Sequence, residues 1–367
     1  IEYGTRVVRK RDQGTQYPVY GGGGKTFYVD KTNRKDRVVI SRFGMSEVCV
    51  REVQGEFFLN DSGLTLSPKS NEISQDYLNK CVLSLQDTFY RLGRGTAQRN
   101  LDITRFKGVV ISFPPLPEQK RIVERLDRAF AEIDKVKEIT HRVYENTKKL
   151  IARSKNSLFD GIVNSSEFLR LDEVSELENG DRGKNYPSAK YRTSSGIPFV
   201  NAGDLSSDGD INDKKMAYIT EERFNLLGSG KFKVDDILFC LRGSLGKSAI
   251  NKSIEIGAIA SSLVIIRANK NIVLPDYLFS FLRSEALKKY IHETAGGAAQ
   301  PNLSAKVVGS YSIPVPSLEA QASISKKFWM IRSQGIEAEN LLESKFNQLE
   351  ILKSTILKQE LSPGKAA

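Results

Sequence analysis

The feature that most constrains the fold of this chain is an internal duplication with a spacing of about 200 residues. The segment AQRNL at 97–101 returns as AQPNL at 299–303, and the proline cluster FPPLPEQ at 113–119 returns as VPSLEAQ at 315–321. Both pairs are separated by 202 residues. Because this spacing exceeds any solenoid period, the sequence predicts two copies of one larger unit rather than a repeat array.

The offset between matching segments of the two copies changes along the chain, which indicates loops of different length in the two copies. DYLNKCVLSL at 76–85 lies over DYLFSFLRSE at 276–285 with an offset of 200, and YPVYGG at 17–22 faces IPFVNA at 197–202 with an offset of 180. Within each copy, short β-rich segments broken by Gly, Asn, Asp and Ser come first. The proline cluster and a long helical pattern follow.

Each helical pattern carries apolar residues at alternating steps of four and three, which is typical of a coiled-coil seam. Since there are two such helices, we expect them to pack against each other as an antiparallel coiled coil. Gly335 is expected to weaken the second helix by about 1 kcal/mol. The residues predicted to pack between the helices are Ile122, Leu126, Ile133, Val136, Leu150, Ile324, Phe328, Ile331, Leu342, Leu349 and Leu352.

The sequence thus predicts an α+β chain with two β-rich domains in a tandem pseudo-repeat, separated by two long antiparallel coiled-coil helices. The expected boundaries are 1–117 for the first domain, 118–163 for the first helix, 164–316 for the second domain, 317–361 for the second helix and 362–367 for a tail.

The charge balance narrows the class of partner. Lys and Arg number 55 against 44 Asp and Glu, for a net charge of +11, which favours an anionic partner and nucleic acid first. No run of 18 apolar residues is present, so we expect no membrane span. The three cysteines are far apart and only two histidines exist, which fits a reducing cytoplasm and predicts no metal site.

Two glycine–lysine loops raise the alternative of a nucleotide-dependent DNA-modifying enzyme. A phosphate-binding loop of the Walker A type needs G-x-x-x-x-G-K-[ST] before a helix. Lys25 follows a glycine run and Lys247 follows Gly246, but both loops lack the first glycine of the motif and both continue into β-formers. A glycine-rich connection between strands is the preferred interpretation; a coiled-coil adaptor without a DNA role is a third hypothesis.

Basic, aromatic and amide side chains interleave in the β-rich parts of both copies. Lys and Arg bind phosphates, and Arg, Asn and Gln read base edges in the major groove. The residues predicted to bind DNA are Lys25, Tyr28, Lys31, Arg42, Arg94, Gln98, Arg182, Lys184, Tyr186, Lys190, Arg192, Asn201, Arg242, Lys247 and Gln300.

Several of these stretches resemble one known family. SFPPLPEQKRIVERLDRAFAEIDKV, from residue 112, is similar to the conserved region of the specificity (S) subunit of Type I restriction-modification systems. SIPVPSLEAQASI, from residue 312, resembles a more divergent second copy, and PVYGGGGKTFYVDK, from residue 18, resembles a turn in the target-recognition domains of that family. The first copy matches only from about Glu2, so roughly ten residues are expected to be missing before it.

The resemblance implies two target-recognition domains, each docking on one half of a bipartite, asymmetric site in double-stranded DNA, with the helix pair fixing the gap between the halves. It further implies a non-catalytic, cytoplasmic subunit that assembles with two methyltransferase (M) subunits and with restriction (R) subunits. S-adenosylmethionine, Mg²⁺ and ATP are then expected on the partner subunits only, with no cofactor and no metal on this chain.

Overall fold

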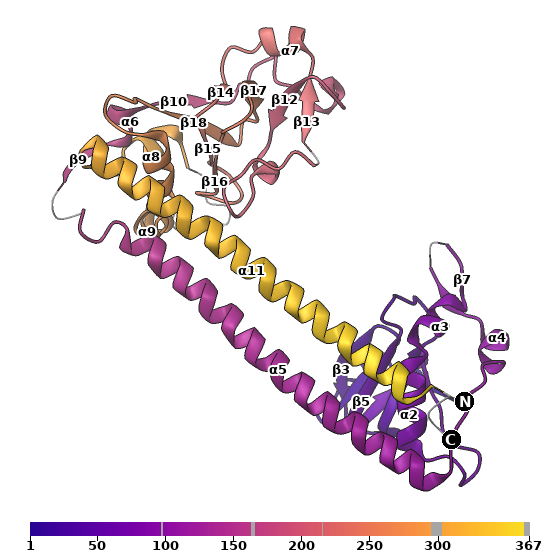
Figure 1. Cartoon of the computed structure of the whole chain (residues 1–367). Coiled ribbons are helices and arrows are strands. Elements are labelled where there is room, and N and C mark those ends of the chain that lie inside the picture. The colour runs from indigo at the N-terminus through magenta and orange to yellow at the C-terminus, as the bar shows by residue number, and fades with distance from the viewer. Residues whose placement is uncertain (97, 163–165, 215, 295–302, 363–367) are drawn as a thin grey trace. The chain divides into compact units, whose positions relative to one another are not determined.

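The computed structural model describes residues 1–96, 98–162, 166–214, 216–294 and 303–362. The chain divides into two compact units: unit 1 comprises Ile1–Val143 and Leu341–Ala367, and unit 2 comprises Tyr144–Asn340. The two long helices, α5 (Leu116–Ser157) and α11 (Leu318–Glu360), each contribute one part to each unit (Figure 1).

Unit 1 is built on a sheet with the strand order β1-β6-β4-β5-β2-β3. All neighbours are antiparallel except β2 and β5, which run parallel. Its strands are β1 (Glu2–Tyr3), β2 (Tyr17–Gly21), β3 (Gly24–Val29), β4 (Arg34–Ser41), β5 (Val50–Leu59) and β6 (Gly63–Thr65), with a small hairpin of β7 (Gly93–Arg94) and β8 (Asn100–Leu101). Its short helices are α1 (Arg9–Asp12), α2 (Gln75–Ser84), α3 (Gln86–Arg91) and α4 (Ile103–Lys107).

The strand β4 shows how the sequence divides the sheet into two faces. Successive side chains of a strand point to opposite faces. Val38 and Ile40 are buried in the cluster that includes Leu78 of α2, whereas Val39 is buried in a different cluster with Phe57 of β5. The sheet therefore carries a core on each side, and α2 covers one of them.

Unit 2 contains two main sheets, with the orders β10-β18-β15-β16 and β11-β13-β12-β17-β14, and a two-stranded sheet of β9 and β19. Its strands are β9 (Glu167–Arg170), β10 (Ser175–Asn179), β11 (Arg192–Thr193), β12 (Ile197–Val200), β13 (Ala217–Ile219), β14 (Lys231–Lys233), β15 (Ile237–Cys240), β16 (Ser248–Ile250), β17 (Ile256–Ile259), β18 (Leu263–Ala268) and β19 (Ser312–Val315). Its short helices are α6 (Leu171–Val174), α7 (Glu221–Asn225), α8 (Pro275–Leu282), α9 (Glu285–Thr294) and α10 (Ala305–Gly309), with 3₁₀ turns at Ala189–Tyr191 and Ala202–Asp204.

The sequence duplication is also a duplication of topology. The order β1-β6-β4-β5 in unit 1 has the same pattern as β10-β18-β15-β16 in unit 2. The parallel pair Val19–Phe58 in unit 1 corresponds to the parallel pair Phe199–Ala258 in unit 2. In unit 1 the single long strand β5 makes both sets of contacts that β16 and β17 divide between them in unit 2.

A buried glutamine fixes the start of each long helix to its own domain. Gln119 donates from Nε2 to the carbonyls of Glu72 (2.7 Å) and Pro114 (2.8 Å), and its Oε1 accepts from the amide of Ser74 (2.8 Å). These groups lie just before α2 and at the start of α5. The side chain thus satisfies three backbone groups at the point where the helix leaves the domain.

The glutamine of the second copy makes the same three bonds. Gln321 donates to the carbonyls of Ile272 (3.0 Å) and Pro316 (2.9 Å) and accepts from the amide of Leu274 (2.8 Å). Both glutamines are fully buried. The proline–glutamine motif of the sequence is therefore a structural device that the duplication kept intact.

The long helices run antiparallel to each other within each unit. In unit 1, Arg125 pairs with Glu360 and Asp134 with Lys353, so rising residue numbers on α5 meet falling numbers on α11. Among the predicted packing residues, six are buried: Ile122, Leu126, Ile133, Ile324, Phe328 and Leu349. Ile331 and Leu342 are half-buried.

Three predicted packing residues are exposed in the structure. The exposed fraction is 39% for Val136, 65% for Leu150 and 45% for Leu352. In α5 the predicted seam holds at Leu126 and Ile133, but the buried residue between them lies one position later than the heptad step predicts. That residue is Phe130, four positions after Leu126 rather than three, and Lys137, which pairs with Glu350, stands one position after Val136 in the same way.

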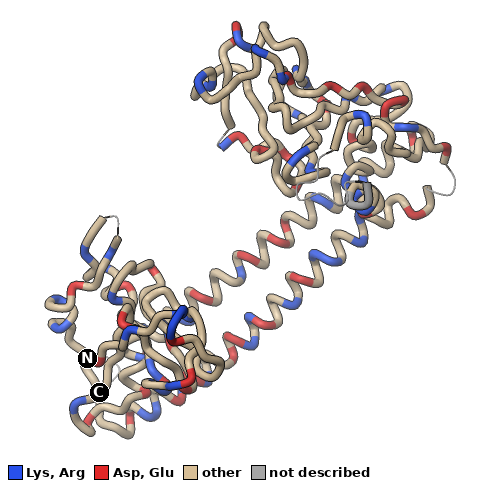
Figure 2. The backbone as a smooth tube through the Cα atoms, turned by 180° about the vertical axis from the view of Figure 1, so that it is seen from behind, with Lys and Arg blue, Asp and Glu red and all other residues tan. Residues whose placement is uncertain are grey.

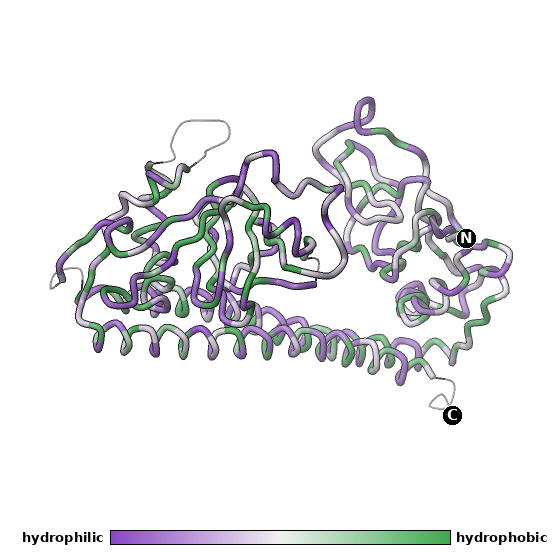
Figure 3. The backbone as a smooth tube through the Cα atoms, turned by 90° about the horizontal axis from the view of Figure 1, so that it is seen from above, coloured by the Kyte–Doolittle hydropathy of each residue, from purple (hydrophilic) through white to green (hydrophobic). Residues whose placement is uncertain are grey.

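Lys137 and Lys353 thus lie between the helices where the heptad pattern predicted the hydrophobic residues Val136 and Leu352. Lys353 lies one residue beyond Leu352, bonds to Asp134 at 3.0 Å, and places its ammonium 4.8 Å from the ring centre of Phe130. Long amphipathic stems can cover an apolar ring while the charge stays at the surface. Figure 3 shows that hydrophobic and hydrophilic residues alternate along the long helices.

Gly335 has a packing role in unit 2 that its helix propensity does not reveal. A Cβ atom placed on Gly335 would lie 2.9 Å from Cδ1 of Ile151 on α5. The missing side chain therefore lets the two helices approach closely at this point, as small residues do at tight helix crossings.

Candidate nucleic-acid interface

The predicted DNA-binding residues of the glycine-rich hairpin lie on the exposed surface of unit 1. Lys25 and Tyr28 both belong to β3, and the Lys25 ammonium is 5.7 Å from the ring centre of Tyr28. Lys31 follows the strand and lies 5.4 Å from the ring centre of Phe58. These cations remain exposed, so they can meet phosphates.

The glycines between β2 and β3 serve the sheet rather than a nucleotide. Gly22 accepts hydrogen bonds at its carbonyl from Ser41 Oγ (2.6 Å) and from Arg51 Nη1 (2.5 Å). Gly24 has φ +104°, a conformation that favours glycine. Because β3 follows directly and no helix begins there, this loop lacks the geometry of a phosphate-binding loop.

Arg42 is partly exposed but contacts residues of its own domain. Its guanidinium lies between the rings of Tyr3 (4.5 Å) and Phe43 (4.8 Å) and donates to the carbonyl of Asp61 at 2.8 Å. Its side chain is half-buried. This arrangement assigns Arg42 a packing role that sequence reasoning missed.

The β7–β8 hairpin presents the other predicted residues of unit 1. Arg94 is exposed and forms an ion pair with Asp102, which caps the following helix α4 by accepting from two backbone amides. Gln98 is exposed beside Gly44. Arg99, which the prediction omitted, stacks 4.7 Å from the ring centre of Tyr90.

In unit 2 the predicted Lys190 belongs to a cluster around Tyr191 that also contains Arg223, an arginine that the prediction missed. Arg223 of α7 lies 3.5 Å from the ring centre of Tyr191, and the Lys190 ammonium lies 4.8 Å from the same ring. Hydrogen bonding by Lys190 and then Arg223 lowers the pKa of the Tyr191 hydroxyl. These side chains line a shallow hollow of about 290 Å³ with Thr193.

The residues before this cluster are placed by backbone contacts. Arg182 is exposed and donates to the carbonyl of Ser261 at 3.3 Å, and Lys184 is exposed. The neighbouring Asp181 accepts from the amides of Gly183 and Gly228, which lowers the pKa of its carboxyl. The turn that carries Arg182 and Lys184 is therefore fixed by a carboxylate between backbone amides.

Two further predicted residues also take part in packing. Tyr186 is half-buried and packs edge-on against Phe199 at 5.9 Å. Arg192 is exposed, with its guanidinium 5.4 Å from the same ring. Phe199 thus joins the two residues in a single aromatic–cationic group.

The remaining predicted residues are separated along unit 2. Asn201 precedes a 3₁₀ turn, and its backbone amide donates to the Asp204 carboxylate at 2.7 Å. Arg242 is exposed and Lys247 is half-buried in the turn between β15 and β16, so the second glycine–lysine loop is also a hairpin. Gln300 lies outside the described residues.

Basic residues that the prediction left out add to both surfaces, and Figure 2 marks the cations along the backbone. Arg9, Lys10 and Arg11 lie in α1, and the run RVVRKRD was a visible signal in the sequence. Arg223 gave no such signal, because it stands in the acidic-looking segment EERFN. Its position beside Tyr191 depends on the tertiary fold.

The part of the chain that the structure describes contains no cluster of His, Cys, Asp and Glu suited to hold a metal ion. Its helices also include none with the length and apolar character needed to cross a membrane.

The sequence matches the family model described as "Type I restriction modification DNA specificity domain" twice, over residues 4–143 and 164–343. The two matches together cover most of the chain. The chain belongs to this DNA specificity family.

Relatives with assigned roles agree with this membership. The MjaVIII specificity subunit of Methanocaldococcus jannaschii is 26% identical over 320 residues, which cover 81% of this chain and 72% of the relative. The EcoKI specificity subunit of Escherichia coli K12 is 25% identical over 291 residues, covering 72% of this chain and 60% of the relative. This specificity protein is accordingly the DNA-recognition subunit of a type I restriction-modification system.

Solved structures share its fold. A chain from a structural study of complex assembly in the type I R-M system superposes with a TM-score of 0.73 at 15% identity, covering 99% of this chain and 95% of the other. The HsdS subunit from Thermoanaerobacter tengcongensis superposes with a TM-score of 0.55 at 14% identity, covering 99% and 94%. The expected α+β fold with two tandem β-rich domains and long antiparallel helices is confirmed, and the nucleotide-enzyme alternative finds no support.

Proposed function

We propose that this specificity subunit reads a bipartite, asymmetric DNA target, with the β-rich domain of each unit contacting one half-site. The supporting observation is the duplicated topology, in which each domain carries its own exposed cations and the same glutamine link to a long helix. Two copies of one reader whose surface residues differ can recognise two different half-sites.

The cations Lys25 and Lys31 in unit 1, and Lys190 and Arg223 in unit 2, are the residues we assign to phosphate or base contact. Such contacts release counterions, so the affinity for DNA falls steeply as salt rises. Replacing Lys190 and Arg223 with alanine should weaken DNA binding and reduce the salt slope by about 1 for each phosphate that the variant no longer neutralises. An unchanged slope would remove these two residues from the interface.

In this proposal the helix pair sets the number of unread base pairs between the half-sites, and two methyltransferase subunits and the restriction subunits assemble around it. The chain itself is non-catalytic and works in the cytoplasm. S-adenosylmethionine, Mg²⁺ and ATP are used by the partner subunits.

Methylome mapping in cells that carry the intact operon tests the proposal directly. Exchanging residues 1–117 for the corresponding domain of a relative should change one half-site and leave the other and the gap unchanged. Lengthening both helices by matched whole turns should change the gap alone. A domain exchange that altered both half-sites would contradict the assignment of one domain to each half-site.

A further inference from the structure

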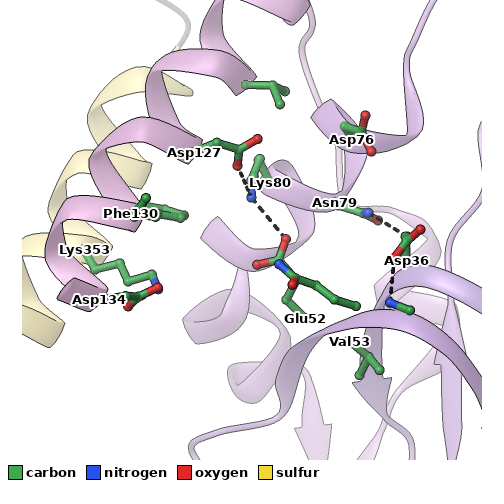
Figure 4. Close-up of a pocket in the computed structure, with 14 residues that line it drawn as sticks. Asp36, Glu52, Val53, Asp76, Asn79, Lys80, Asp127, Phe130, Asp134 and Lys353 are labelled. Carbon is green, nitrogen blue, oxygen red and sulfur yellow. Dashed lines mark hydrogen bonds and ion pairs between the residues drawn. The ribbon is translucent and has the colours of Figure 1, made fainter. Parts of the chain in front are cut away.

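A groove in unit 1 lies between α5, α2 and the β4–β5 strands, and it has an acidic lining (Figure 4). Its volume is about 670 Å³. Five carboxylates and two ammonium groups line it, which leaves a formal charge of −3. The charged lining residues are Asp36, Glu52, Asp76, Asp127, Asp134, Lys80 and Lys353.

Internal ion pairs account for only three of these carboxylates. Lys80 bonds to Glu52 at 3.1 Å and to Asp127 at 2.8 Å, and Lys353 bonds to Asp134. Within the described residues, the Asp36 carboxylate accepts only from the backbone amide of Gly55, at 2.7 Å. Asp76 lies exposed in the first turn of α2, and no residue that the structure describes donates to its carboxylate.

The same pair of aspartates is present in unit 2, where a lysine of the chain itself joins them. Asp276 corresponds to Asp76 in the repeated DYL segment. Asp235 corresponds to Asp36, because these two are the non-glycine residues with positive φ among those that the structure describes. Asp36 stands four residues before Ile40, and Asp235 stands four residues before Phe239, which occupies the same place in the matching strand.

Lys252 bonds to Asp235 at 2.9 Å and to Asp276 at 3.0 Å, so one ammonium neutralises both carboxylates. The indole of Trp329 on α11 also donates to Asp276, at 2.8 Å. In unit 2, side chains of the chain itself therefore occupy the position beside the two aspartates that is open in unit 1.

Strand register identifies what stands in unit 1 where unit 2 has its lysine. Ile40 pairs with Val50, as Phe239 pairs with Ser248, so the position of Lys252 corresponds to Gln54. Gln54 lines the groove but carries no charge. The position of Trp329 corresponds to Asp127, at the same offset of 202 as the two glutamines. Unit 1 thus keeps both aspartates, but it has Gln54 and Asp127 where unit 2 has the donors Lys252 and Trp329.

We propose that this groove of unit 1 receives a lysine or arginine side chain from a methyltransferase subunit, which pairs with Asp36 and Asp76. This partner rests on the proposed function. Asp36 and Asp76 are both exposed, and the preference for a cation rests on the net negative charge of the groove lining and on Lys252, which bridges the equivalent aspartates in unit 2. A DNA strand is disfavoured here, because its phosphates would meet an excess of carboxylates. The aliphatic stem of the incoming side chain would lie along Phe130 and Val123.

The test measures the affinity of the full-length chain for the purified methyltransferase subunit of the same operon. The double variant Asp36→Asn/Asp76→Asn should bind at least about 10-fold more weakly, since it removes both carboxylates that pair with the incoming cation. Glu56→Gln removes an exposed carboxylate of β5 outside the groove lining and should leave the affinity unchanged.

Gln54→Lys provides the sharper variant, because it gives unit 1 the internal lysine of unit 2. We expect a higher melting temperature for the free chain together with weaker binding of the methyltransferase subunit, as the new lysine occupies the acid pair. Carbodiimide should also cross-link Asp76 of the wild type, and not of Gln54→Lys, to a partner lysine if the donor is a lysine. An arginine donor would give no cross-link but the same decrease in affinity.

The outcomes separate this inference from the proposed function. If the wild type binds the methyltransferase subunit and all the groove variants bind equally well, the groove is not a contact site and the inference is wrong. If the wild type itself fails to bind, the proposed assembly is contradicted.

Discussion

The two units share one hydrogen-bonded link between domain and helix but fill the space behind it differently. In unit 2, Phe279 stacks on Trp329 at 5.8 Å and meets Phe328 at 6.0 Å, so aromatic rings join α8 to α11. In unit 1, Lys80 of α2 meets Asp127 of α5 across an open groove. Backbone groups that need partners constrain a duplicated fold strictly, whereas the side chains around them are free to change.

The largest expected effect comes from removing the shared link. Gln119→Ala and Gln321→Ala should each lower the free energy of unfolding by about 3 kcal/mol, because each leaves buried backbone groups without partners. Chemical denaturation, followed by hydrogen exchange of each unit, measures the decrease. Gln348→Ala on the exposed face of α11 is the control and should change little. A decrease confined to one of the two glutamines would show that the link is not equivalent in the two units.

A smaller effect is expected where the helices approach most closely. Gly335→Leu should destabilise unit 2 by about 2 kcal/mol, because the new side chain overlaps Ile151. Gln334→Leu adds the same side chain at the neighbouring exposed position and should be nearly neutral. If both variants melt like the wild type, the helices can separate here without cost and the close contact is not a constraint.

Lys80 in unit 1 and Asp235 in unit 2 should each contribute a stabilisation that is lost at opposite ends of the pH scale. Burial opposes the charge of Lys80, but Asp127 and Glu52 outweigh it and raise the pKa of the ammonium. Its stabilisation is therefore complete below the ordinary lysine value of about 10.4 and is lost as pH rises through the higher folded pKa.

For Asp235, burial is outweighed by Lys270 and Lys252, which lower the pKa of the carboxyl. Its stabilisation is present above about 3.9 and is lost as pH falls through the lower folded pKa. The unfolding free energy of each variant is subtracted from that of the wild type across the pH range, and the difference should be under about 1 kcal/mol at its plateau. For Lys80→Met this difference should shrink in alkali, and for Asp235→Asn it should shrink in acid. Curves that shrink at the same end would contradict this comparison.

The smallest effect concerns the thiols, which should be inert in both units. Burial raises the pKa of Cys81 in unit 1 to about 12 and also raises the pKa of Cys240 in unit 2. Because the thiolate is the reactive form, labelling by a thiol reagent at pH 8 should be slow until the chain unfolds. Ser46→Cys places an exposed thiol in unit 1 and should react at once. Fast native labelling of Cys81 would show that its helix opens locally.

Most of the architecture was readable in the sequence because the duplication and the long helices depend on patterns that repeat. The heptad steps predicted the antiparallel helices, but not that Phe130 would be buried in the seam while Val136 is exposed. A one-residue shift costs little where lysines such as Lys353 can cover the ring. The pattern of hydrophobic residues therefore fixed which helices pair, while side-chain size and ion pairing fixed the register.

The DNA-facing surface was less predictable. Lys25 and Lys190 are exposed, as a basic surface requires. Arg42, in contrast, contacts aromatic rings of its own domain. Arg223 belongs to the candidate surface only because α7 places it beside Tyr191. Exposure and partner contacts of a surface cation depend on residues far away in the chain, and local composition does not encode them.

By itself, the sequence determined the duplication, the two β-rich domains and the two antiparallel helices, because periodicity and repeated motifs are local properties. Only the tertiary structure decided that Gln119 and Gln321 join each helix to its domain, and that Asp36 and Asp76 share a groove in which no described side chain bridges them with a cation. Those features arise where segments distant in the sequence meet. Burial, charge and hydrogen bonding there depend on spatial neighbours that a local sequence pattern cannot predict.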